Sequence, residues 1–235
     1  MDYREASDEI VRKLQLDTPP IALAFVASAP AGVQGFEGEV PSACSFWRRA
    51  EAGVFYASAR QHFNCLIGTM TMGFDMPVQA QEELMDLVGQ MVTLGYIAAD
   101  EPERIPSVRK AKKGIVYGPL NEFPIPVDLV LMWLSPRQAM LYNEAISSSS
   151  WINAPTPLFA RPACGALPMA FNGQQTAFSM GCLGMRTFTQ IADDRLLGVL
   201  PGSQVDDLVA ALRSTVDANE AMGCYYRAQK ARFAG

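Results

Sequence analysis

The sequence predicts an α+β (mixed α/β) fold on the strength of three observations. Short apolar runs alternate with longer stretches whose apolar residues recur at helical spacing. Two further segments place β-type residues around a turn signal and are predicted as β-hairpins. Because strands and helices are mixed along the chain, one sheet system packed against helices is favoured. The expected architecture is two related β-hairpin/helix halves that form one compact unit.

The first half is expected to contain two helices, a strand and a hairpin. Residues 5–15 have the spacing of a short helix, and the apolar run from Ile21 to Val26 is typical of a buried strand. The segment from Cys44 to Ser58 predicts a hairpin that turns at Gly53. A longer helix is predicted from Pro77 to Gly95, where apolar residues keep helical spacing.

A polar, basic stretch, residues 101–113, is the expected surface connection between the halves. Two predicted strands follow, from Gly114 to Gly118 and from Val127 to Leu134. Ser135-Pro136 is typical of an N-cap followed by a first-turn proline, so a helix is expected to begin there.

The last third of the chain is expected to contain a hairpin, a strand and a final helix. The hairpin is predicted from Pro162 to Ser179 with Asn172-Gly173 at its tip, because this dipeptide favours tight hairpin turns. Leu196 to Leu200 has the composition of a strand. Ser203 is the expected N-cap of the final helix, with Asp206 at the capping-box position.

The composition limits the partners that the protein can have. The 235 residues carry 19 basic and 24 acidic side chains, a formal net charge of −5, which argues against nucleic acid or an anionic membrane as a partner. Only 18% of the residues are charged while 49% are hydrophobic. With so little surface charge, we expect part of the surface to be covered by a ligand or by a second subunit, as in a homodimer.

The residue counts also limit the chemistry and the compartment. A single histidine excludes metal sites and proteases that need several imidazoles. The polar start of the chain is unlike a secretory signal, and no apolar run reaches the roughly 18 residues of a membrane span. A cytoplasmic protein is expected, in which the five cysteines are reduced thiols, metal ligands or redox groups.

Four of the five cysteines occur in a possible internal repeat. In both copies an Ala-Cys pair is followed nine positions later by a glycine and then by a Cys-Leu pair. The cysteines are Cys44, Cys65, Cys164 and Cys182. Gene duplication within a single domain, residues 1–235, would give related halves at about 1–100 and 114–235; chance similarity of such short pairs is the alternative.

A pseudo-twofold axis between such halves would gather four thiolates around one point. Four thiolates suit an iron–sulfur cluster or a structural zinc ion. The backbones at Gly68 and Gly184, which follow the second cysteine of each pair, would be able to approach the sulfur atoms closely. Two other interpretations stay open, namely buried inert thiols and a catalytic or redox thiol. Cys224 has no partner in the repeat.

The segments around these cysteines are Ala43-Cys44, His62-Phe63-Asn64-Cys65-Leu66-Ile67-Gly68, Arg161-Pro162-Ala163-Cys164 and Ser179-Met180-Gly181-Cys182-Leu183-Gly184-Met185-Arg186. They resemble the family catalogued as domain of unknown function 169 (DUF169), whose pattern includes the four cysteines. The resemblance covers nearly the whole chain. The family's abundance in anaerobes implies an iron–sulfur cluster, and the resemblance implies no settled activity.

Other side chains near the cysteines are candidates for supporting roles. His62 lies three residues before Cys65, so it is a candidate metal ligand, a candidate general base for that thiol, or a donor to a cluster sulfur. Four arginines near the cysteines are candidates for lowering a thiol pKa or holding an anionic substrate, with solvated surface positions as the alternative: Arg48 and Arg49 near Cys44, and Arg161 and Arg186 beside the second pair.

The expected function is a cytoplasmic metal–thiolate protein that binds a [4Fe–4S] cluster through Cys44, Cys65, Cys164 and Cys182. Redox work with a partner protein, or activation of a small substrate, would be its task. One alternative is an enzyme that uses the Cys65 thiol with His62 on a small substrate. Another is a protein that binds haem or a further organic ligand, and zinc is the alternative metal.

Overall fold

The computed structural model describes residues 2–109, 113–147 and 157–233. Within these residues, seven strands form one mixed sheet in the order β2-β3-β1-β4-β7-β6-β5. Every neighbouring pair is antiparallel except β5 and β6. The strands are β1 (Ile21–Val26), β2 (Phe55–Ser58), β3 (Gly114–Pro119), β4 (Leu129–Leu134), β5 (Leu158–Phe159), β6 (Ala177–Ser179) and β7 (Leu196–Pro201).

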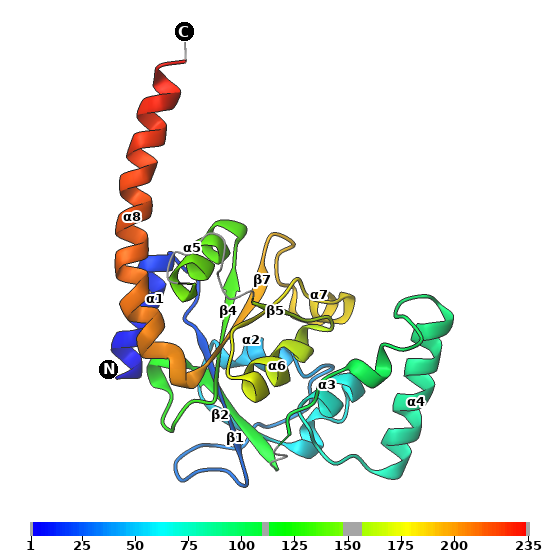
Figure 1. Ribbon diagram of the computed structural model, residues 1–235. Helices are drawn as coiled ribbons and strands as arrows, with labels where there is room; N and C mark the ends of the chain where they lie inside the picture. Colours follow the sequence, from blue (N-terminus) through cyan, green and yellow to red (C-terminus); the bar gives the residue numbers. More distant parts are fainter. Residues whose placement is uncertain (1, 110–112, 148–156, 234–235) are drawn as a thin grey trace.

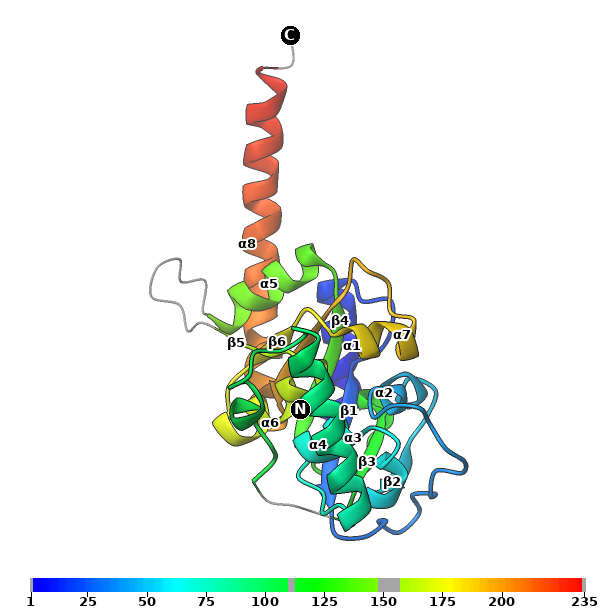
Figure 2. The same cartoon turned by 90° about the vertical axis from the view of Figure 1, so that its right-hand side faces the viewer.

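Helices cover both faces of the sheet, as Figures 1 and 2 show. One face carries α1 (Tyr3–Leu14), α5 (Pro136–Ile146) and the first half of α8 (Val205–Ala231). The other face carries the shorter helices α2 (Ser45–Ala50), α3 (Leu66–Thr71), α6 (Ala166–Gly173) and α7 (Leu183–Thr189), with α4 (Val78–Thr93) beyond α3. The last turns of α8 project away from the body of the molecule.

The two central strands are buried on both sides, and this gives the molecule two cores. Along β4, Leu129, Leu131 and Trp133 pack toward the short helices, and the alternate residues pack toward α1, α5 and α8. β1 divides its residues in the same way. Because successive side chains of a strand point to opposite faces, a strand covered on both sides becomes a continuous apolar run. The uninterrupted runs in the sequence therefore predict both strands correctly.

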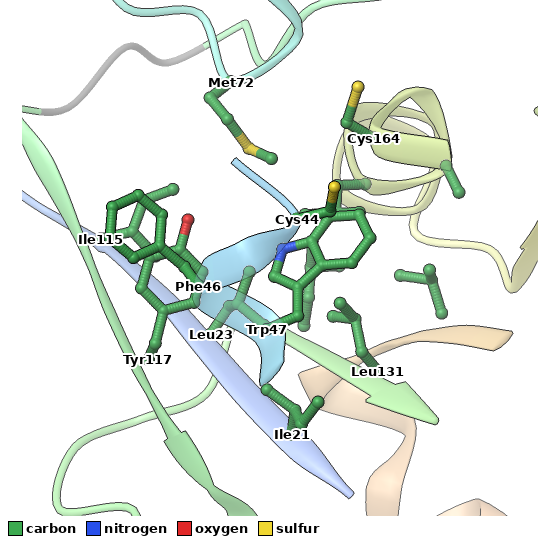
Figure 3. Close-up of a cluster of buried hydrophobic side chains, with 14 of the residues drawn as sticks. Ile21, Leu23, Cys44, Phe46, Trp47, Met72, Ile115, Tyr117, Leu131 and Cys164 are labelled. Atoms are coloured by element: carbon green, nitrogen blue, oxygen red, sulfur yellow. The ribbon is translucent and has the colours of Figure 1, made fainter. Parts of the chain in front are cut away.

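The core on the side of the short helices is built around large aromatic residues (Figure 3). Phe46 and Trp47 of α2 are fully buried, and Phe46 stacks on Tyr117 of β3 with ring centroids 5.4 Å apart. Cys44 and Cys164 lie on the same side of this cluster, above Trp47 in the view. The aromatic residues thus form an apolar layer against which the segments with Cys44 and Cys164 pack.

The mixed α/β class is confirmed, and so are most of the predicted elements. The helix that begins at Ser135 has the expected capping box, in which the Gln138 amide donates to the Ser135 hydroxyl and the Ser135 amide donates to the Gln138 side chain. No helix in the described part of the chain is both long and apolar enough to cross a bilayer. Residues 110–112 of the predicted connection lie outside the described residues.

The two predicted hairpins are wrong. The segment after Cys44 forms α2 before it reaches β2, and Gly53 lies in the turn between them. In the second segment Asn172 and Gly173 end α6, and Gln174 takes the left-handed conformation (φ 48°) that commonly closes a helix. Each copy is therefore a helix followed by a strand. Ser203 is also not an N-cap, because α8 begins at Val205 and the Ser203 hydroxyl donates to the Gln174 side chain.

The strands form two groups with matching registers. β1 pairs with β3 from Ile21 opposite Pro119 onward, and β4 pairs with β7 from Leu129 opposite Pro201 onward. The outer strands follow the same rule, because β2 and β6 each begin opposite the residue two positions before that proline. Between the groups, β1 and β4 are antiparallel, as a twofold axis requires.

We infer from this register that the chain consists of two related halves, β2-β3-β1 and β4-β7-β6 with their helices. In this scheme β3 belongs to the first half, so the halves divide between Pro119 and Leu129. The expected division at residues 100–114 would assign β3 to the second half.

The junction between β7 and α8 depends on a glycine. A Cβ atom at Gly202 would lie 1.9 Å from the Val127 carbonyl oxygen, whereas a Cβ at Gly53 would meet nothing within 4 Å. We therefore expect Gly202→Ala to lower the free energy of unfolding by about 2–3 kcal/mol and Gly53→Ala to change it by less than about 0.5 kcal/mol. Urea unfolding measures both, and equal stabilities of the two variants would contradict this packing.

Candidate functional site

The four repeat cysteines occupy equivalent places in the two halves. Cys44 immediately precedes α2, and Cys164 lies in the 3₁₀ turn Ala163–Gly165 that leads into α6. Cys65 is the N-cap residue of α3, and Cys182 is the N-cap residue of α7. Helix α2 of the first half packs against α7 of the second, and α3 packs against the turn that carries Cys164. This exchange of contacts between the halves brings the four cysteine segments together.

All four of these cysteines line one cavity of about 820 Å³. Cys44 and Cys164 are buried, while Cys65 and Cys182 are partly exposed. Most of the other lining side chains are apolar; they come from α3, α4 and α7 and from the segments before α2, after α4 and before α6. Cys224, on the projecting part of α8, is exposed and far along the chain from this wall. The four cysteines that the sequence repeat selects are therefore the ones that line the cavity, and Cys224, which lies outside the repeat, does not line it.

The buried thiols are held in their neutral form. Burial raises the pKa of Cys44 to about 12, against a hydrogen bond from Ser42, whose hydroxyl lies 3.0 Å from the sulfur. Burial also raises the pKa of Cys164 well above its usual range, and negative charge on Cys65 and Cys182 raises it further. Each of these two buried thiols has its pKa raised by neighbouring cysteines because the thiols are grouped around one cavity.

Glycine allows the chain to pack tightly around Cys65. A Cβ atom at Gly68 would lie 2.9 Å from the Cys65 sulfur and 2.6 Å from the Ala43 Cβ atom, so no larger residue fits without movement. In the second half, the Met185 amide donates to the Cys182 sulfur over 3.4 Å. Gly184 lines the cavity, and a Cβ there would meet no atom closer than 4.0 Å.

His62 lies behind the cysteines, in the aromatic core. Its Nδ1 is 2.8 Å from the Ser58 carbonyl oxygen and its Nε2 is 2.9 Å from the Tyr117 hydroxyl. Since a carbonyl only accepts, Nδ1 carries the proton and Nε2 accepts from Tyr117. Burial lowers the pKa of His62 to about 4, so the ring is neutral. With both ring nitrogens engaged in the core, His62 is not placed as a base for Cys65.

His62 instead supports the loop that carries Cys65. Its carbonyl oxygen accepts a hydrogen bond from the Cys65 amide over 2.9 Å and another from the Thr69 hydroxyl over 2.7 Å. The Thr69 hydroxyl also lies 3.0 Å from the Cys65 carbonyl oxygen. These bonds fix the turn between the 3₁₀ helix Ala59–His62 and α3.

Arg186 holds loops together and is not among the described residues that line the cavity. Its guanidinium donates to the carbonyl oxygens of Ala192, Met180 and Arg195, at 2.7, 2.7 and 2.8 Å. These three contacts join the segments on either side of α7. The sequence interpretation of Arg186 as a ligand for a cofactor or substrate therefore has no support in its contacts.

Among the described lining residues the cation is Arg161, one of the four arginines that the sequence interpretation considered as holders of an anionic substrate. Its guanidinium lies 4.4 Å above the centroid of the Tyr96 ring and donates to the Tyr96 carbonyl oxygen over 2.8 Å. Both residues line the cavity, together with Glu101. Tyr96 follows α4, which is distant in sequence from Arg161, so only the folded chain reveals this pair.

Among the described residues, no three His, Cys, Asp or Glu side chains are grouped closely enough to hold a single metal ion. The four thiols share the lining of one cavity.

A family model matches residues 9–211 of this chain. The chain belongs to the DUF169 family. The family is described as uncharacterised ArCR, and its matched region spans both halves of the sheet and all four cavity cysteines. No curated protein and no solved structure matches the chain. DUF169 membership is thus established, and the chemistry of the site rests on its geometry.

The depressed pKa of His62 makes the stability of the protein depend on pH. Between pH 6.5 and about 4 the unfolded chain binds a proton at His62 that the folded protein excludes, so stability falls as pH falls. We expect wild type to lose about 2 kcal/mol relative to His62→Gln between pH 7 and pH 5. Urea unfolding at both pH values measures this, and other ionisable groups cancel in the comparison. Parallel pH profiles would contradict it.

Proposed function

We propose that this DUF169 protein binds a [4Fe–4S] cluster through Cys44, Cys65, Cys164 and Cys182. The observation that carries the proposal is that four thiols from four separate segments line one cavity. Four cysteine thiolates are the usual ligand set of such a cluster. Their occurrence as two equivalent pairs, one in each half, matches the symmetry of a four-iron cluster.

The surroundings of the thiols favour a bound cation. A thiolate in an apolar cavity is costly because it loses its hydration, and this is why burial raises the pKa of Cys44 and Cys164. Bound iron would supply the compensating positive charge and stabilise the thiolate form. Without the positive charge of bound iron, the four buried or half-buried cysteines would have no evident role in the cavity.

The size of the cavity favours a cluster over a single zinc ion. In a [4Fe–4S] cluster each thiolate binds a different iron atom, so the four sulfur atoms are spaced more widely than around one zinc ion. A cavity of about 820 Å³ exceeds what a single ion needs and leaves room for a second molecule beside the cluster. We therefore favour a cluster that works next to a bound molecule.

When bound, a cluster would supply electron transfer or an open Lewis-acid position. The protein's own part is to line the site with apolar side chains of α4 and α7. Reduced thiols suit a cytoplasmic location, and a small substrate or a redox protein is the partner that this chemistry needs. The alternative of a thiol enzyme with His62 as its base is disfavoured, since the His62 nitrogens bond Ser58 and Tyr117.

Anaerobic reconstitution tests the cluster. Protein treated with iron and sulfide and then desalted is expected to retain about four of each per chain and a visible charge-transfer absorption. Cys→Ser at position 44, 65, 164 or 182 is expected to reduce the retained iron by at least about half, because each removes one thiolate ligand. Iron and acid-labile sulfide analysis provide the measurement.

The matched control is Cys224→Ser, since Cys224 is exposed on α8 and does not line the cavity. This variant is expected to retain as much iron and sulfide as wild type. A folded wild-type protein that retains neither iron nor sulfide would refute the proposal. So would equal iron retention in the Cys44→Ser and Cys224→Ser proteins.

A further inference from the structure

The cavity has a second part, formed away from the cysteines by the end of α4 and the chain that follows it. Its walls there are the side chains of Leu87, Met91, Ile97, Ile105 and, from α7, Phe188. These residues are apolar and come from both sides of the cavity. The volume of about 820 Å³ is within the range of pockets that hold small organic molecules. An apolar part of a ligand would be desolvated favourably against this wall.

One cation, the exposed Arg161, borders this apolar surrounding. The charged side chains among the described lining residues are Arg161 and Glu101. Glu101 is within 3.7 Å of the Arg104 guanidinium, which gives its carboxylate a basic partner. Arg161 has no carboxylate partner in the described part of the chain; its contacts are the Tyr96 ring and the Tyr96 carbonyl oxygen. The positive charge facing the cavity is therefore left without an anion.

The geometry of Arg161 suits a carboxylate. A guanidinium has five N–H donors, and the Tyr96 carbonyl oxygen accepts from Nη2. The Tyr96 ring, with its centroid 4.4 Å from Cζ, covers one face of the guanidinium and limits its movement. The donors at its edge remain for a planar, two-oxygen acceptor, which is the arrangement that arginine and carboxylate prefer.

We propose that this cavity binds an apolar carboxylate, with the carboxylate on Arg161 and the apolar part between α4 and α7. This inference names the substrate class of the proposed cluster site and rests on the proposed function only for what happens to the molecule once bound.

A series of ten-carbon probes with different head groups tests the inference. Isothermal titration of the full chain at pH 7.5 compares decanoate, decanol and decyltrimethylammonium. Decanoate is expected to bind at least about tenfold more tightly than decanol, because only it forms charge-assisted hydrogen bonds. Decyltrimethylammonium is expected to bind more weakly than decanol. Equal affinities for decanoate and decanol, or binding of none of the three probes, would overturn the inference.

Variants of Arg161 identify the group responsible. Arg161→Gln is expected to reduce decanoate binding to the level of decanol and to leave decanol binding unchanged. Arg161→Lys, which keeps the charge and loses the planar pair of donors, is expected to give an intermediate affinity and provides a second test if the first variant does not fold. Arg213→Gln is the matched control, because Arg213 is exposed on α8, pairs with Glu9 and does not line the cavity. Decanoate affinity unchanged in both Arg161 variants would overturn the inference.

The same titrations separate this inference from the cluster. They are carried out on metal-free protein and again after anaerobic reconstitution. Decanoate binding that depends on Arg161, in a protein that retains no iron, would refute the cluster alone. Retention of iron and sulfide without a preference for decanoate over decanol would refute the carboxylate site alone.

Discussion

The antiparallel pairing of β1 with β4 is the contact on which the rest of the structure depends. It joins the two halves at the centre of the sheet, with Ala22 opposite Val130. Both strands are buried on both faces, so a shift of one residue would turn each apolar row to the wrong side. The register is thereby fixed. Because α2, α3, α6 and α7 are all anchored to this sheet, the same pairing decides where the four cysteines meet.

The cysteine cavity combines two opposing demands. An apolar wall stabilises the fold through burial, and the same wall makes an ionised thiol unfavourable. Neutral Cys44 and Cys164 satisfy this in the metal-free protein, with the Ser42 hydroxyl beside one of the sulfur atoms. The polar pair of His62 and Tyr117 is hydrogen-bonded within the core, with both His62 nitrogens engaged. The hydrogen-bonded pair of His62 and Tyr117 thus supports the site, and the reactive groups of the site are the cysteine sulfur atoms.

The sequence predicts the elements whose pattern is long or strongly apolar, and misplaces the short ones. Helix α4 and strands β1 and β4 carry clear periodicity or unbroken apolar runs. Helix α2 has six residues, too few for a period to show, and its Phe46 and Trp47 have strand propensity that core packing overrides. Asn172-Gly173 is ambiguous because the residues that favour a hairpin turn also favour the end of a helix.

The candidate site could be predicted in part for similar reasons. The repeat of Ala-Cys and Cys-Leu pairs identifies the four cysteines of the cavity. His62 and Arg161 are candidates from the sequence, but their partners are not, because Arg161 meets Tyr96 across 65 positions of sequence and His62 meets Tyr117 across 55. The sequence contains many possible pairs of side chains, and only tertiary packing decides which distant side chains meet.

The matched register of the two strand groups also bears on how such a site can originate. A chain with one half alone would leave the inner edge of β1 with unpaired amides and carbonyls. Two identical copies would bury those edges against each other around a twofold axis, since an antiparallel central pair is isologous. In such a homodimer each subunit would contribute two of the four cavity cysteines, and fusion of the two genes would place all four in one chain.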